Sequence, residues 1–402
     1  MIKIVQLSTS HNRGAIGKIM EQVGVKAKNE LGYEGWVIFG RYNPVSELKC
    51  IKMGNLYEVV EHYLENRLLD NEGLGSRCMT KKIVQKLKEI QPDIVHLHNI
   101  HDHWLNYPIL FEYLNSTDIK VVWTFHDCWA YTGHCFHFVT AGCDKYKTEC
   151  NHCIQKDIFL DRSKRNFNLK KRLFLGNKNL HITTVSNWLK DVTSESFFKG
   201  CDIRVIPNGL DIQSFTPEPN SQNVWNLPTD KHLIMAVAND WYEEKGLSDY
   251  YRLVEMLSDD YQLVLVGMQP KQIKKLPKGI IGLTRTKSQQ ELMWLYNLSS
   301  VVVSMSKAET FGLTIAEGMA CGTPSVVYDN TAHPELISED TGIVVKTGDV
   351  TAFKEAIIRV CGKEKASYKK ACRRRAEERF DKEKCFAKYL DLYQELVDEN
   401  RK

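Results

Sequence analysis

At 402 residues the chain is too long for one hydrophobic core, and it is predicted to form two domains of ordinary size. The contents of 43% apolar and 26% charged residues are those of a globular protein, and a net charge of +4 argues against a nucleic-acid-binding chain. No apolar run approaches the ~20 residues of a membrane-spanning helix. Residues 1–7 lack the length and cleavage site of a signal peptide, so we expect a cytoplasmic protein.

Apolar strand-like segments alternate with helix-like segments from end to end. The expected strands of the first half are residues 2–7, 36–39, 93–97, 121–125 and 181–185. After residue 230 the pattern resumes, with expected strands at residues 233–238, 263–267, 301–305, 325–328 and 343–345. Apolar residues repeat at intervals of three and four over 16–31 and 81–90, which predicts helices there. This alternation predicts an α/β fold of parallel sheets covered on both faces.

The domain boundary is expected between residues 206 and 230. This stretch has the composition of a linker, with prolines at 207, 217, 219 and 228. We therefore place one domain at 1–206, a second at 207–380 and a terminal helix at 381–402. That helix is expected either to cross back onto the first domain or to cap the second.

Two carboxylates, Glu309 and Glu317, are separated by seven residues after the expected strand 301–305. The sequence predicts a strand, a tight loop and a helix, with Glu309 in the loop and Glu317 about one turn into the helix. The backbone N–H groups between them would point out of the helix N-terminus, which is an anion site by geometry and dipole. Those groups belong to Phe311, Gly312, Leu313 and Thr314.

This run resembles the E-x7-E motif of the retaining GT-B glycosyltransferases of the family-4 type. Further segments resemble the same family in the same order: TFHD at 124–127, IPNGLD at 206–211, KGL at 245–247 and VLVG at 264–267. The resemblance implies the GT-B fold, in which two Rossmann-like domains face each other across a cleft. The acceptor would bind mainly to the first domain and a nucleoside-diphosphate sugar, with UDP or GDP, mainly to the second.

The resemblance assigns donor-side roles in the second domain. Lys245 would contact the diphosphate, and the carboxylate of Glu317 would accept two hydrogen bonds from the ribose. Glu309 would stabilise the positive charge of an oxocarbenium-like transition state, without acting as a nucleophile. The arginine that the family usually has before the lysine is missing, and Asn239 is expected to offer a neutral hydrogen bond instead. In the first domain, Gly14 would let the donor approach the backbone.

The acceptor side is expected around His126, which follows strand 121–125 at the edge where doubly wound sheets bind ligands. The resemblance places His126 beside the transferred sugar as a catalytic group, and a structural histidine is the alternative. Asp127 and His98 are expected nearby. The implied acceptor is a glycan or a polyprenyl-diphosphate-linked glycan of bacterial surface polysaccharide synthesis. No cofactor is implied for catalysis.

A cysteine-rich insertion is expected at about 128–160. Cys135, Cys143, Cys150 and Cys153 follow the pattern C-x7-C-x6-C-x2-C, and the C-x2-C end has the spacing of a tetrahedral metal site. The pattern predicts a structural zinc ion, with unbound thiols, disulfides or a redox cluster as alternatives.

The basic stretch 162–174 has interleaved apolar residues, so it is expected either to rest on the inner face of an anionic membrane or to form a solvated helix with one buried face. Two other functions fit the same fold. One is a nucleotide-sugar epimerase, which would change the donor with no acceptor present. The other is a non-catalytic protein that binds sugar nucleotides or glycans. No nucleic-acid partner is expected.

Overall fold

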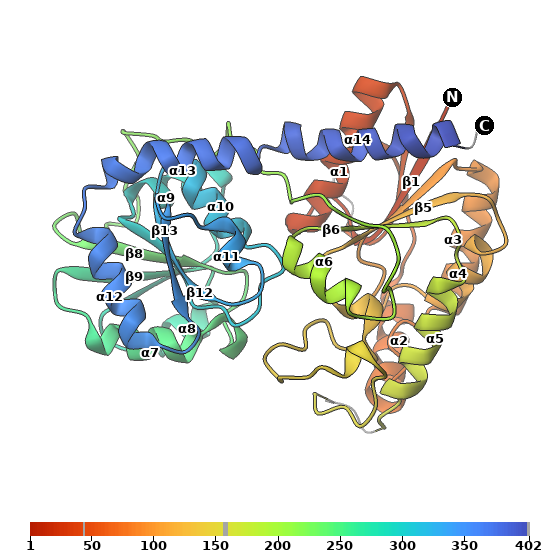
Figure 1. Cartoon of the computed structure of the whole chain (residues 1–402), viewed down its shortest axis with the longest axis horizontal. Coiled ribbons are helices and arrows are strands. Elements are labelled where there is room, and N and C mark those ends of the chain that lie inside the picture. The colour runs from red at the N-terminus through yellow and green to blue at the C-terminus, as the bar shows by residue number, and fades with distance from the viewer. Residues whose placement is uncertain (43–44, 156–159, 400–402) are drawn as a thin grey trace. The chain divides into compact units, whose positions relative to one another are not determined.

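The computed structural model describes residues 1–42, 45–155 and 160–399. The chain divides into two compact units, Met1–Ile206 with Phe386–Lys402, and Pro207–Cys385. Each unit holds one parallel sheet with helices packed around it (Figure 1).

The sheet of the first unit has the strand order β3-β2-β1-β4-β5-β6-β7, and all neighbouring strands are parallel. Its strands are β1 (Lys3–Ser10), β2 (Glu34–Arg41), β3 (Lys49–Lys52), β4 (Ile94–Leu97), β5 (Lys120–Phe125), β6 (Leu180–Thr184) and β7 (Ile203–Val205). Its helices are α1 (Gly14–Leu31), α2 (Leu56–Leu69), α3 (Arg77–Ile90), α4 (Tyr107–Leu114), α5 (Ser163–Leu175) and α6 (Asn187–Ser194).

The second sheet has the order β10-β9-β8-β11-β12-β13 and is also parallel. Its strands are β8 (His232–Val237), β9 (Tyr261–Val266), β10 (Ile280–Leu283), β11 (Val301–Ser304), β12 (Ser325–Asp329) and β13 (Gly342–Lys346). Its helices are α7 (Leu247–Met256), α8 (Pro270–Ile273), α9 (Gln289–Leu298), α10 (Leu313–Ala320), α11 (His333–Leu336), α12 (Val350–Cys361) and α13 (Lys365–Arg379).

Both sheets confirm the predicted α/β architecture. All four residues of β4 are buried, as are the first three of β11, because helices cover both faces of each sheet. The three-and-four spacing of α1 likewise buries Ile19, Val23 and Ala27 against the sheet. The apolar positions of the sequence therefore predict which residues are buried in the core of each unit.

Three short strands, β3, β7 and β10, were not predicted from the sequence. Strand β3 has a lysine at each end and only Cys50 and Ile51 between them, β7 has three residues, and all four residues of β10 are only partly buried. Helix α2 was not expected either, because its apolar side chains stay largely exposed and leave no clear buried stripe.

Helix α14 (Lys382–Glu399) belongs to the first unit from Phe386 onward. Two of its tyrosines reach buried polar groups of the first sheet. The Tyr393 hydroxyl lies 2.6 Å from His96 Nδ1 on β4, and the Tyr389 hydroxyl lies 3.1 Å from Thr124 Oγ1 on β5. Without this helix, the buried side chains of His96 and Thr124 would each lose a hydrogen-bond partner.

Within the described ranges, no helix combines the length and the apolar character that crossing a bilayer requires.

Candidate functional site

Lys245 and Glu309 meet in the second unit. Lys245 ends a short 3-10 turn, and the next residue, Gly246, has a φ of 76°. A Cβ at Gly246 would lie 2.2 Å from the Met305 carbonyl oxygen, so only glycine fits where this turn crosses the end of β11. The turn places Lys245 Nζ 2.5 Å from Glu309 Oε1.

The Lys245–Glu309 pair is charged on both sides. Burial works to lower the pKa of Lys245, but the neighbouring carboxylate outweighs burial and raises that pKa. Burial likewise works to raise the pKa of Glu309, but the charge and hydrogen bond of Lys245, together with His333 and Ser306, lower that pKa. Each side chain keeps about a quarter of its surface exposed, so a ligand can reach both groups.

Helix α10 starts two residues after Phe311, with Gly312 as its N-cap at a φ of 98°. Since glycine has no side chain, no side-chain cap covers the first N–H groups, and the first turn contains no acidic residue. A Cβ at Gly312 would lie 2.8 Å from Leu336 and 3.1 Å from His333 of α11. Phe311 is buried with its ring against Phe380, which assigns its side chain to packing.

Glu317 lies in α10, four positions after its first residue. Its Oε2 accepts a hydrogen bond of 2.7 Å from the hydroxyl of Tyr296 on α9. The sequence did not point to Tyr296, because nothing in an isolated tyrosine predicts a partner 21 positions away. The hydroxyl orients a partly buried carboxylate one turn behind the helix N-terminus.

A small cavity lies in the first unit, at the ends of β4 and β5. It is lined by His98, Asn99, His101, Trp123, Thr124, Phe125, His126, Asp127, Trp129 and Ala130. The three expected acceptor-side residues therefore border one space. Burial lowers the pKa of His126 to about 4, so this imidazole is neutral at pH 7.

Asp127 is held by two contacts in this cavity. Its Oδ2 lies 2.8 Å from His101 Nε2, and its Oδ1 accepts a hydrogen bond of 2.8 Å from the Trp129 amide. Burial works to raise the pKa of Asp127, but the charge and hydrogen bond of His101 and the hydrogen bond from the Trp129 amide act together to lower it to about 2. The sequence shows His101 only as one of four clustered histidines and assigns it no role, and its partnership with Asp127 becomes visible only in the fold.

Two other residues that were expected on the donor side, Asn239 and Gly14, make no contact described above with Lys245, Glu309 or Glu317. Asn239 is exposed in the loop after β8. Gly14 is the first residue of α1 in the first unit, with a φ of 69° and no atom within 4 Å of an added Cβ. The tight position of that turn is Gly17, where a Cβ would lie 3.1 Å from the Asn12 nitrogen.

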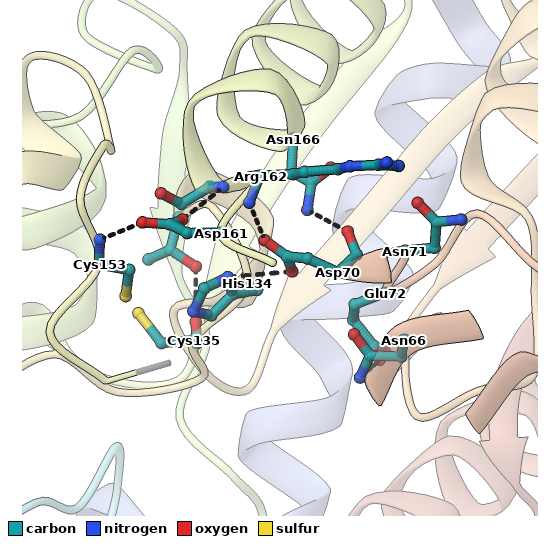
Figure 2. A network of polar contacts seen from close by, with 12 residues as sticks. Asn66, Asp70, Asn71, Glu72, His134, Cys135, Cys153, Asp161, Arg162 and Asn166 are labelled. Carbon is teal, nitrogen blue, oxygen red and sulfur yellow. Dashed lines mark hydrogen bonds and ion pairs between the residues drawn. The ribbon is translucent and has the colours of Figure 1, made fainter. Parts of the chain in front are cut away.

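Two carboxylates contact the cysteine-rich insertion, and one of them lies at the end of α2 (Figure 2). Asp70, the buried C-cap of α2, lies 3.2 Å from His134 Nδ1 and accepts a hydrogen bond of 2.7 Å from the Arg162 amide. Asp161 accepts one of 2.7 Å from the Cys153 amide. Burial works to lower the pKa of His134, but contacts with Asp70 and Cys153 raise it to about 9.

The predicted zinc ligands form no metal-binding group among the residues that the structure describes. Within 1–42, 45–155 and 160–399, no three His, Cys, Asp or Glu side chains gather into a group that could hold a metal ion. Burial raises the pKa of Cys135 to about 12 and that of Cys150 to about 11, whereas zinc ligands are thiolates. Residues 156–159 of the expected insertion lie outside the described residues. The zinc ion stays a prediction.

Metal analysis of protein purified without added metal checks this prediction. If the cysteines hold zinc, we expect about one zinc per chain, reduced well below that in Cys150→Ser and Cys153→Ser. The matched control is Cys201→Ser, an exposed cysteine outside the insertion. A wild-type protein that folds with no bound zinc would contradict the zinc site and favour the alternative of unbound thiols.

The basic stretch forms α5, and its apolar residues face inward. Phe167, Leu173 and Phe174 are buried. Lys170 is buried as well, donating to the carbonyl oxygens of Trp129 and Thr132 at 2.6 and 3.1 Å. This arrangement corresponds to the helix with one buried face, and any membrane contact of α5 would have to rest on its exposed cations.

Two family models match consecutive parts of the chain. The family described as Glycosyltransferase Family 4 matches residues 26–214, and the family described as Glycosyl transferases group 1 matches residues 217–379. Together they reach into both units and include the cavity at the ends of β4 and β5, the Lys245–Glu309 pair and helix α10.

The chain is also similar to individual proteins. It is 24% identical over 274 residues to WcaC of Escherichia coli (strain K12), named as a glycosyl transferase of colanic acid biosynthesis, with 64% of this chain and 65% of that protein covered. It is 24% identical over 186 residues to the O-antigen chain mannosyltransferase RfbU of Salmonella typhimurium, with 44% and 50% covered. The chain thus spans less than two thirds of the length of these curated relatives.

Solved structures agree with the fold over nearly the whole chain. Sucrose-phosphate synthase from Thermosynechococcus elongatus superposes with a TM-score of 0.74 at 18% identity, covering 99% of this chain and 100% of that one. HepE from Anabaena, in complex with UDP and glucose, superposes with a TM-score of 0.70 at 15% identity, covering 98% and 100%. These similarities assign the GT-B fold.

Proposed function

Because this chain belongs to the glycosyltransferases of family 4, we propose that it moves a sugar from a nucleoside-diphosphate sugar to a glycan or lipid-linked glycan, with retention of anomeric configuration. The pathway would be bacterial surface-polysaccharide synthesis, in keeping with the names of WcaC and RfbU. We place the protein in the cytoplasm and propose a membrane contact through the exposed cations of α5.

One observation carries this proposal. Lys245 and Glu309 form a reachable ion pair, the uncapped N-terminus of α10 follows within four residues, and Glu317 lies one turn further on. A diphosphate matches the lysine and the free N–H groups, and a ribose diol matches the carboxylate of Glu317. Glu309 is then left beside the position where the transferred sugar leaves the diphosphate.

The nucleotide base is proposed to be uracil, with guanine as the alternative. HepE, which shares the fold, was solved with UDP and with UDP-glucose. The residues described above bind phosphate and ribose, which all these donors share, so they do not distinguish the bases.

A thermal-shift panel of UDP-, GDP- and ADP-sugars tests the donor site, followed by assays for transfer and hydrolysis. A ligand at ~100 times its dissociation constant should stabilise the fold by ~2.7 kcal/mol. We expect one base to give a clear shift, and its sugar to be transferred. Donor conversion without an acceptor would favour the epimerase, and binding without turnover over many acceptors would favour the binding protein. No shift in folded protein would contradict the donor site.

A further inference from the structure

Gln6 on β1 has a fixed amide orientation. Its side chain is 1% exposed, and its Nε2 donates a hydrogen bond of 2.9 Å to the Met20 carbonyl oxygen. A carbonyl oxygen accepts and never donates, so the NH₂ group must face Met20. The amide oxygen of Gln6 therefore faces the opposite way, toward His98.

This orientation fixes the proton on His98. The Nε2 of His98 lies 3.2 Å from Gln6 Oε1, which can only accept, so His98 carries its proton on Nε2. Burial holds the pKa of His98 well below its usual value, so the ring has one proton at pH 7. Its Nδ1 is left as a bare acceptor.

The same reasoning extends one residue further, to His126. His98 Nδ1 lies 3.2 Å from His126 Nε2, and a bare acceptor there requires the His126 proton on Nε2. The Nδ1 of His126 is then also bare. It is buried and has no hydrogen-bond partner among the described residues, and its side chain borders the cavity of the first unit.

We propose that Gln6 and His98 are positioning residues that hold His126 as the Nε2–H tautomer, so that its Nδ1 accepts a hydrogen bond from a hydroxyl of the bound sugar. The inference rests on the proposed function for the identity of the ligand, but the direction of the hydrogen-bond chain follows from Met20, Gln6 and His98 alone.

This chain of hydrogen bonds makes the site selective for a ligand group that donates a hydrogen bond. A sugar hydroxyl can give its hydrogen to Nδ1, whereas an ether or carbonyl oxygen at the same position would face a second lone pair. A site built to pair a hydroxyl rejects the analogue that lacks it, because the buried nitrogen is left unpaired. Removing the sugar hydroxyl that pairs with His126 Nδ1 should therefore lower kcat/KM, and the affinity for the free nucleotide should change less.

Nitrogen NMR of the full chain with ¹⁵N-labelled histidine reads the tautomer directly and needs no substrate. In the wild type we expect the His126 signals of a protonated Nε2 and a bare Nδ1. Assignment comes from the spectrum of His126→Gln. A protonated Nδ1 in the wild type would overturn the proposal.

Substitution of Gln6 tests the direction of the chain. In Gln6→Glu, the carboxylate should draw a second proton onto His98, whose Nδ1–H would then face His126 Nε2 and push the His126 proton to Nδ1. The matched control is Gln262→Glu in the second unit, whose side chain also donates to a carbonyl oxygen, that of Gly279, at 2.7 Å. An unchanged His126 tautomer in folded Gln6→Glu would overturn the proposal.

Substitution of His98 separates positioning from packing. His98→Asn keeps an amide oxygen that can accept from His126, and His98→Leu does not. We expect the asparagine to keep the tautomer and most of kcat, and the leucine to lose both, with kcat/KM lower by roughly 10- to 100-fold. Equal losses in the two folded variants, with the tautomer unchanged, would mean that His98 only packs.

The two proposals fail in different ways. If the wild-type tautomer is as expected but no nucleotide sugar binds or reacts, the proposed function fails and the hydrogen-bond chain stands. If variants in which His126 carries its proton on Nδ1 transfer sugar at normal rates, the hydrogen-bond chain from Gln6 to His126 has no role in catalysis. The proposed function then stands.

Discussion

Replacing Glu317 with Ala is expected to weaken the binding of the free nucleoside diphosphate by about 100-fold, or ~2.8 kcal/mol. The carboxylate would accept two hydrogen bonds from the ribose, and a hydrogen bond to a charged group contributes about 1.5–3 kcal/mol. Calorimetric titration of UDP and GDP measures this change. Unchanged affinity in folded protein would remove Glu317 from the ribose site.

Tyr296→Phe is the graded companion to this substitution. It removes only the hydroxyl that donates to Glu317 Oε2 at 2.7 Å and leaves the carboxylate in place. We expect a loss of affinity of a few-fold, smaller than in Glu317→Ala. Since the alanine variant leaves the buried Tyr296 hydroxyl without this partner, its unfolding should be measured too, with an expected loss of about 1–3 kcal/mol.

Replacing Glu309 with Gln is expected to lower kcat by about 10²–10³-fold, the size of effect seen when one electrostatic contact to a transition state is removed. Glutamine keeps the shape and loses the negative charge. Donor affinity should change by only a few-fold, because Lys245 stays in place and can pair with the diphosphate. Single-turnover kinetics with a saturating donor separates the two quantities.

Glu243→Gln provides the matched control for Glu309→Gln. Glu243 pairs with Lys307 in the same unit, but its side chain is 61% exposed and has no assigned part in the site. We expect near wild-type kcat, since an exposed ion pair contributes ~1 kcal/mol or less. Wild-type turnover in Glu309→Gln itself would remove the electrostatic role of that carboxylate.

Local patterns predicted much of the fold and part of the site. The apolar runs gave the main strands of both sheets, and the spacing of Glu309 and Glu317 gave a loop carboxylate and a helical one, as the bounds of α10 show. These features depend on residues close together in sequence. Short or exposed elements such as β10 and α2 carry too weak a pattern to be recognised.

Partners that lie far apart in the chain could not be predicted in this way. Lys245 and Glu309 are 64 positions apart, and Gln6 and His98 are 92. The sequence shows that each residue is polar, but only the fold shows which polar group it meets. The cysteine pattern remains a prediction, because its spacing suits zinc and the described residues alone form no group of three or more ligands.

The contact of α14 with the first sheet affects how the protein is made. Tyr393 meets His96 across 297 positions, so the first unit uses residues that are synthesised long after its own strands. At roughly 5–20 residues per second, strand β4 would wait on the order of 15–60 s for its partner helix. The second unit can complete its core earlier in synthesis, although it comes later in the chain. A nascent chain released before α14 would have all seven strands of the first sheet but not the helix that packs on them, so that surface would be exposed to chaperones and proteases.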